Sequence, residues 1–79
     1  MNHQYILYSS EGCHLCEQAL ALCLPLMSSE QKESLKIVDI VDDEALVELY
    51  GVHIPVLKRM NDNQQLFWPF TTKQIVAFI

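Results

Sequence analysis

Basic residues are scarce in this chain of 79 residues, which has five Lys and Arg against ten Asp and Glu. The net charge of −5 argues against a nucleic-acid partner, because nucleic acids are usually bound by a basic face. The few basic residues are scattered, and only Lys58 and Arg59 are adjacent. We therefore expect neither a nucleic acid nor an anionic membrane surface among the partners of this protein.

Long apolar runs and a targeting segment are absent as well. No apolar run approaches the roughly 18 residues that a membrane-spanning helix requires. Residues 1–4 begin neither the basic region nor the apolar stretch of a secretory signal peptide. The sequence therefore predicts a cytoplasmic protein without a membrane span.

The chain is short but rich in apolar residues, which make up 51% of it. This fraction argues against disorder, and the length leaves room for one hydrophobic core only. We expect residues 1–79 to form a single domain, and the protein to act as a monomer.

Hydrophobic patterns predict the element order β-α-β-α-β-β-α. The predicted strands are residues 4–8, 35–40, 56–60 and 64–68, and the predicted helices are 13–24, 44–50 and a last one capped by Thr71. A right-handed crossover makes the first two strands parallel, whereas the final hairpin is antiparallel. The fold class is therefore α/β, with a four-stranded mixed sheet and helices on both faces.

Several local features refine this prediction. Pro25 either kinks the first helix or opens a second short one, and residues 28–34 are predicted to be a helix end and a loop. Residues 61–63 are a turn of the kind that tolerates left-handed conformations. The first helix should bury an inner stripe of Cys16, Leu20, Cys23 and Met27, flanked by Leu15, Ala19, Leu22 and Leu26. The last helix should bury Ile75, Val76, Phe78 and Ile79.

Cys13 and Cys16 are separated by two residues and stand between a predicted strand and a predicted helix. This placement is typical of a thiol–disulfide redox site. Free backbone N–H groups at a helix start stabilise a thiolate, so Cys13 is the expected nucleophile. Cys16 lies one turn further along and is the expected resolving thiol. A protonated His14 would lower the pKa of Cys13, unless it is merely an exposed polar residue, while Glu11 would act in the opposite direction.

Other interpretations of the two cysteines remain open. A zinc site usually needs four ligands, and the only further soft ligands are Cys23 and the three histidines His3, His14 and His53. We therefore expect no metal. Cys23 follows Cys16 on the apolar stripe and is expected to fill the core, because free cysteine is often buried.

Residues 51–57 (Gly-Val-His-Ile-Pro-Val-Leu) resemble the cis-proline segment of thioredoxin-fold proteins. Residues 8–16, residues 50–52 and residues 68–70 are further similar to small bacterial glutaredoxin-like proteins. The resemblance implies a thioredoxin-like fold for the whole chain, with a cis peptide between Ile54 and Pro55 beside Cys13. The backbone of Ile54 would then pair with an extended substrate like an added strand.

The resemblance also implies a function. We expect a thiol–disulfide oxidoreductase in which the Cys13/Cys16 couple acts on a disulfide-containing protein or a small thiol, and in which His14, Leu15, Ile54 and Pro55 contact the substrate. The alternatives are a non-catalytic binding module and a metal or iron–sulfur carrier that uses Cys13.

No cofactor is expected, and glutathione is the candidate reductant. Three departures from glutaredoxins argue against a glutathione site. His14 replaces a common proline, Ser10 replaces a common lysine, and residues 68–71 (Trp-Pro-Phe-Thr) replace a glycine pair and an acidic residue. Trp68 and Phe70 are expected to pack in the core or the hairpin rather than to contact substrate.

Overall fold

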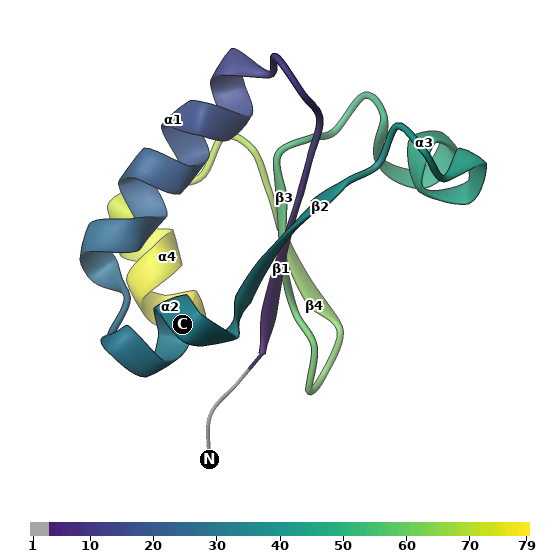
Figure 1. Cartoon of the computed structure of the whole chain (residues 1–79). Coiled ribbons are helices and arrows are strands. Elements are labelled where there is room, and N and C mark those ends of the chain that lie inside the picture. Colours follow the sequence, from purple (N-terminus) through teal and green to yellow (C-terminus); the bar gives the residue numbers. More distant parts are fainter. Residues whose placement is uncertain (1–3) are drawn as a thin grey trace.

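The computed structural model describes residues 4–79 (Figure 1), so His3 and the start of the chain lie outside the described part. Its strands are β1 (Tyr5–Ser9), β2 (Leu35–Asp39), β3 (Val56–Arg59) and β4 (Gln64–Phe67). Its helices are α1 (His14–Cys23), the 3-10 helix η1 (Leu24–Leu26), α2 (Ser29–Ser34), α3 (Glu44–Tyr50) and α4 (Thr72–Phe78).

The four strands form one mixed sheet in the order β2-β1-β3-β4. β1 pairs with β2 in parallel and with β3 antiparallel, and β3 and β4 form an antiparallel hairpin. Tyr8 stands opposite Val56, so the end of β1 and the start of β3 lie at the same end of the sheet. The predicted fold class and the predicted pairing of strands are confirmed.

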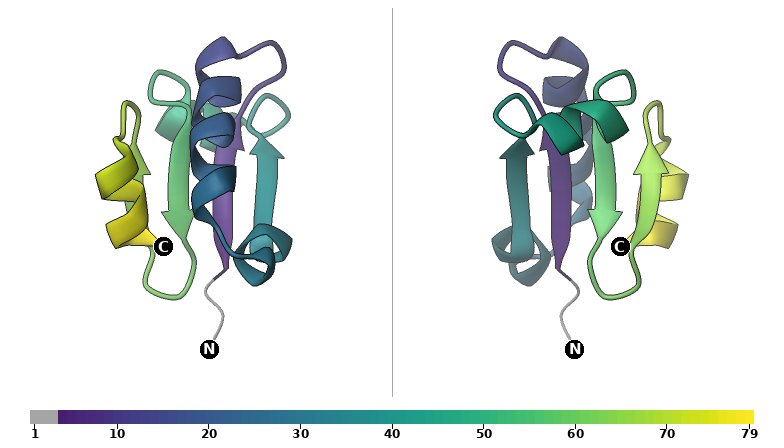
Figure 2. Two further views of the ribbon diagram at one scale, coloured as in Figure 1. Left: turned by 90° about the vertical axis from the view of Figure 1, so that its left-hand side faces the viewer. Right: turned by 90° about the vertical axis from the view of Figure 1, so that its right-hand side faces the viewer.

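Helices cover both faces of the sheet, as predicted (Figure 1, Figure 2). α1 and α4 lie on one face and α3 lies on the other. Successive residues of β1 point to opposite faces, which divides the core into two clusters. The α1 and α4 side contains Tyr5, Leu7, Ala19, Cys23, Met27, Leu57, Phe70 and Ile75, and the α3 side contains Tyr8, Ile40, Tyr50 and Val56.

The prediction of a helix end and a loop for residues 28–34 is wrong, because most of this segment forms the separate helix α2. A capping box starts this helix: Gln31 donates its backbone N–H to Ser28 Oγ, and Ser28 donates its own to Gln31 Oε1. The segment lacks an apolar stripe, so helical periodicity could not predict it. Pro25 opens the separate short helix η1, which is one of the two outcomes that the sequence allowed.

Two apolar residues lie outside the faces predicted for them. Val76 is 57% exposed, whereas its neighbour Ile75 is fully buried. Neighbouring helical residues point about 100° apart, and in α4 the side of Ile75 faces the core while the side of Val76 faces solvent. Leu15 is 47% exposed on α1, while Ala19 is fully buried. Leu15 therefore belongs to the surface near the cysteines rather than to the core.

Candidate active site

A tight loop connects the end of β1 to the first turn of α1. The backbone N–H of Cys13 donates to the carbonyl of Ser10 over 3.2 Å, which closes the turn. Gly12 has a φ of +78°, a left-handed conformation that residues with a Cβ rarely adopt. The loop therefore reverses the direction of the chain in a tight turn, which places Cys13 at the start of the helix.

Cys13 is the N-cap residue of α1, and its sulfur takes the place of a capping oxygen. The backbone N–H of Cys16 donates to Cys13 Sγ over 3.1 Å. N–H groups at a helix start carry partial positive charge and have no partner within the helix. This geometry favours a thiolate at Cys13 when the pair is reduced.

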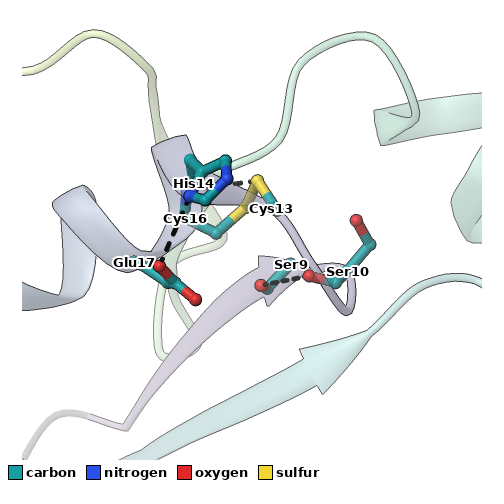
Figure 3. The surroundings of a disulfide bond; sticks show 6 residues. All are labelled: Ser9, Ser10, Cys13, His14, Cys16 and Glu17. Atoms are coloured by element: carbon teal, nitrogen blue, oxygen red, sulfur yellow. Dashed lines mark hydrogen bonds and ion pairs between the residues drawn. A yellow bond between two sulfur atoms is a disulfide. The ribbon is translucent and has the colours of Figure 1, made fainter.

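Cys13 and Cys16 form a disulfide, with their Cα atoms 5.2 Å apart (Figure 3). Cys13 is partly exposed, whereas Cys16 is only 4% exposed. The first sulfur can therefore be reached from solvent and the second is covered, which is the difference in burial that the sequence predicted.

His14 follows Cys13 and points outward. Its Nδ1 atom lies 3.7 Å from a carboxylate oxygen of Glu17, and both side chains are largely exposed. Glu17 is therefore an acidic neighbour of the redox pair in addition to Glu11, which the sequence alone indicated. The spacing of three residues on one helix, which brings side chains together, was the signal for this pair.

The segment before β3 meets the same end of the sheet. The Ile54–Pro55 peptide is cis, as the resemblance implied. Pro55 is buried, and its carbonyl accepts a hydrogen bond from Trp68 N over 3.2 Å. Because Tyr8 pairs with Val56, this segment stands beside the residues that lead from β1 into the cysteine loop.

The backbone of Ile54 offers less to a substrate than an open strand does. Its N–H donates to the carbonyl of Tyr50 over 3.0 Å. Within residues 4–79 its own carbonyl receives no hydrogen bond. An added strand normally uses both groups of a residue, and here the N–H is taken. The expected strand-like pairing is thereby reduced to one acceptor at Ile54.

The remaining expected contact residues lie as follows. His14 and Leu15 are exposed on the first turn of α1, and Ile54 is partly exposed. Phe70 is buried in the core, with the Trp68 ring edge-on to it and the centroids 5.1 Å apart. Trp68 and Phe70 therefore pack in the protein as expected. The Trp68–Pro69 peptide is also cis, which no sequence signal indicated.

The third cysteine is chemically distinct from the pair. Cys23 is 1% exposed in the cluster beneath α1, and burial raises the pKa of its thiol to about 11. Desolvation disfavours a thiolate, so this thiol is inert at neutral pH. The prediction that Cys23 fills the core is confirmed.

No group of three or more His, Cys, Asp or Glu side chains within residues 4–79 is arranged to hold a metal ion. No helix in that range has the length and apolar character needed to cross a membrane.

Comparisons with known proteins agree with the fold. Residues 4–79 match the protein family described as Glutaredoxin-like domain (DUF836). No curated protein matches the chain. The crystal structure of the structural-genomics target XcR50 from X. campestris is 32% identical, with a TM-score of 0.81 over 94% of this chain and 92% of that one. The solution structure of Ne2328 from Nitrosomonas europaea is 30% identical, with a TM-score of 0.79 over 100% and 93%.

Proposed function

Because the chain belongs to the family of glutaredoxin-like domains, we propose that it is a thiol–disulfide oxidoreductase with Cys13 and Cys16 as its redox couple. One observation carries the proposal. The two cysteines share the first turn of α1, where the reachable sulfur of Cys13 accepts an N–H hydrogen bond and Cys16 is covered behind it.

The reaction begins with the reduced pair. The Cys13 thiolate attacks one sulfur of a substrate disulfide, and the other substrate sulfur leaves as a thiolate that takes up a proton. Cys16 then loses its proton and attacks Cys13 Sγ in the resulting mixed disulfide. The Cys13–Cys16 bond forms and the second substrate thiol is released. Two electrons pass from the dithiol to the substrate, which leaves the pair in the disulfide form seen here.

Burial assigns the two roles. A substrate disulfide has to approach the attacking sulfur in line, and only Cys13 is open to it. Cys16 needs to reach Cys13 alone, and their Cα separation of 5.2 Å allows this without movement of the helix. The reaction needs no metal and no bound cofactor, and the substrate is a disulfide in a protein or a small molecule.

Trapping experiments test this proposal. The reduced protein should exchange with a neutral model disulfide, and Cys13→Ser should abolish the exchange. Cys16→Ser should accumulate a mixed disulfide on Cys13 that is detectable by mass spectrometry. Cys23→Ala is the matched control and should exchange like the natural protein, since that thiol is buried.

The same variants separate the alternatives. A non-catalytic binding module would show no exchange and would be insensitive to Ser at either position. A metal or iron–sulfur carrier that uses Cys13 would retain metal after purification from growth medium that contains iron and zinc, and would lose it in Cys13→Ser. Either result would overturn the proposed function.

A further inference from the structure

Charged side chains are unevenly distributed along the strands: four of the five basic residues lie toward one end of the sheet, with Glu30, Glu33 and Asp62, and six of the ten carboxylates lie toward the other. The loop after β1 and the loop after β2 leave the same end of the sheet, because these strands are parallel. Six carboxylates lie at the end of β2, in these two loops and at the helix starts that follow them: Glu11, Glu17, Asp39, Asp42, Asp43 and Glu44. All of these side chains are exposed. The cysteine pair belongs to the same end of the molecule, in the loop and first turn that contain Glu11 and Glu17. Figure 3 shows Glu17 on the same helical turn as the two cysteines.

The basic residues lie mostly at the opposite end. Lys36 and Lys58 both pair with Ile6, near the start of β1, and Arg59 pairs with Tyr5. Lys32 is in α2, which leads into the start of β2. Only Lys73, in the first turn of α4, follows a strand that ends on the side of the cysteines. The formal side-chain charges around the redox pair are therefore mostly negative, apart from this lysine and any protonated His14 or His53, and the partial positive charge of the α1 N-terminus acts only close to Cys13.

The backbone beside the redox pair also favours a ligand that donates hydrogen bonds. The N–H of Ile54 is bonded to Tyr50, and Pro55 has no N–H to offer. What remains for a substrate at these two residues is the carbonyl of Ile54, which is a hydrogen-bond acceptor. A ligand that binds along Ile54 and Pro55 has to supply an N–H donor. The nearby carboxylates favour such a ligand if it carries positive charge.

We infer that the redox pair is selective for disulfides in cationic polypeptide segments and discriminates against anionic thiols. This inference rests on the proposed exchange function. The substrate's backbone N–H would bond the Ile54 carbonyl, and its Lys or Arg side chains would lie near the carboxylates. Glutathione carries two carboxylates and one ammonium group, so its disulfide is anionic and is repelled by the same charges.

Peptide disulfides of matched length test the selectivity. The substrates are symmetrical peptide disulfides with two Lys, two Ser or two Glu beside the cysteine, together with glutathione disulfide. The rate at which the fully reduced protein reduces each of them is measured at pH 7. At about 20 mM ionic strength we expect the Lys peptide to react about fivefold to tenfold faster than the Ser peptide. The Glu peptide and glutathione disulfide should be slower than the Ser peptide. In about 0.5 M salt the differences should shrink to about twofold, because ions screen exposed charges.

A charge-removal variant identifies the origin of any preference. Glu11→Gln combined with Asp42→Asn removes two exposed carboxylates at the redox end, neither of which makes a side-chain hydrogen bond within residues 4–79. The ratio of Lys-peptide to Glu-peptide rates should fall by about threefold or more. Glu33→Gln, exposed in α2 at the far end, is the matched control and should leave the ratio unchanged. Each ratio is independent of any change in the general reactivity of Cys13.

The outcomes separate the two proposals. Equal rates for the three peptides, or a faster Glu peptide, would overturn the charge selectivity and leave the exchange function standing. Rapid reduction of glutathione disulfide at low salt would do the same. No reaction with any peptide, including the neutral one, would overturn both.

Discussion

The backbone N–H of Cys16 donates a hydrogen bond to the sulfur of Cys13, over 3.1 Å. The bond belongs to the first turn of α1, where backbone N–H groups have no other partner. At the N-cap position, the sulfur of Cys13 thus accepts the N–H hydrogen bond that an oxygen of Ser or Asp would normally accept. This hydrogen bond stabilises an anionic sulfur at Cys13 but not at Cys16, although only two residues separate them.

The first prediction concerns the pKa of Cys13 in the reduced protein. The N–H bond and the helix dipole act directly on the sulfur, whereas Glu11 and Glu17 are exposed and screened by solvent, so the pKa of Cys13 should lie below the value near 8.5 of a free cysteine. The alkylation rate of Cys13 should therefore rise with pH and reach half of its maximum below pH 8.5. Iodoacetamide labelling followed by peptide mass spectrometry measures this, with a cysteine-containing tripeptide as the control. A midpoint pH for Cys13 at or above that of the tripeptide would contradict the prediction.

The second prediction concerns Cys23 and the pH dependence of stability. Burial raises the pKa of Cys23 from its ordinary 9.0 to about 11. Between these two values the unfolded chain has lost this proton and the folded protein still holds it. The unfolded state then binds fewer protons, so this group lowers the free energy of unfolding as pH rises from about 9 to about 11.

Urea unfolding of the natural protein and of Cys23→Ala across this pH range tests the effect. Tyrosines and lysines titrate in the same range in both proteins, so the difference between the two slopes isolates Cys23. The natural protein should lose stability more steeply. Parallel slopes would show that Cys23 ionises in the folded protein as readily as in the unfolded chain.

The sheet and the redox loop could be predicted from sequence because strong, local signals specify them. Residues 5–8 form a buried strand, and Gly12 sits where the loop needs a left-handed residue. The parallel pairing of β1 with β2 and the antiparallel hairpin of β3 and β4 followed from the order of the elements. These features depend on apolar patterning and chain direction, which a single sequence records directly.

What could not be predicted depends on particular hydrogen bonds. The N–H of Ile54 is taken by Tyr50, a bond that requires the precise path of residues 50–54. α2 is stabilised by polar contacts, including one from Gln31 Nε2 to the carbonyl of Ile79 at the other end of the chain. The Ser28 and Gln31 pair was visible as a capping signal, but without an apolar stripe beside it the segment was predicted as a loop.

The third prediction concerns the start of α4. Thr71 Oγ1 accepts a hydrogen bond from Gln74 N over 3.1 Å, and Gln74 Oε1 accepts one from Thr71 N over 2.8 Å. Thr71→Ala removes the first of these, which should cost about 1 kcal/mol of unfolding free energy. Thr72→Ala is the matched control, because the Thr72 side chain makes no hydrogen bond within residues 4–79. Equal losses in the two variants, measured by urea unfolding, would contradict a capping role.

The fourth prediction contrasts the two glycines, which are needed for different reasons. Gly12 has a φ of +78°, but a Cβ added there would meet nothing within 4 Å. Gly51 has an ordinary helical φ of −51°, but its Cβ would lie 2.5 Å from the carbonyl oxygen of Val47. The first position is limited by backbone conformation and the second by space.

Alanine should therefore destabilise both positions, by about 1–2 kcal/mol at Gly12 and about 1–3 kcal/mol at Gly51. Asparagine distinguishes them, because it tolerates left-handed backbone better than other residues with a Cβ. Gly12→Asn should recover part of the loss seen with Gly12→Ala, whereas Gly51→Asn should be at least as destabilising as Gly51→Ala. Urea unfolding of the four variants measures this. Recovery by asparagine at Gly51 would mean that the contact with Val47 is relieved by a small shift of the chain, and that space does not limit this position.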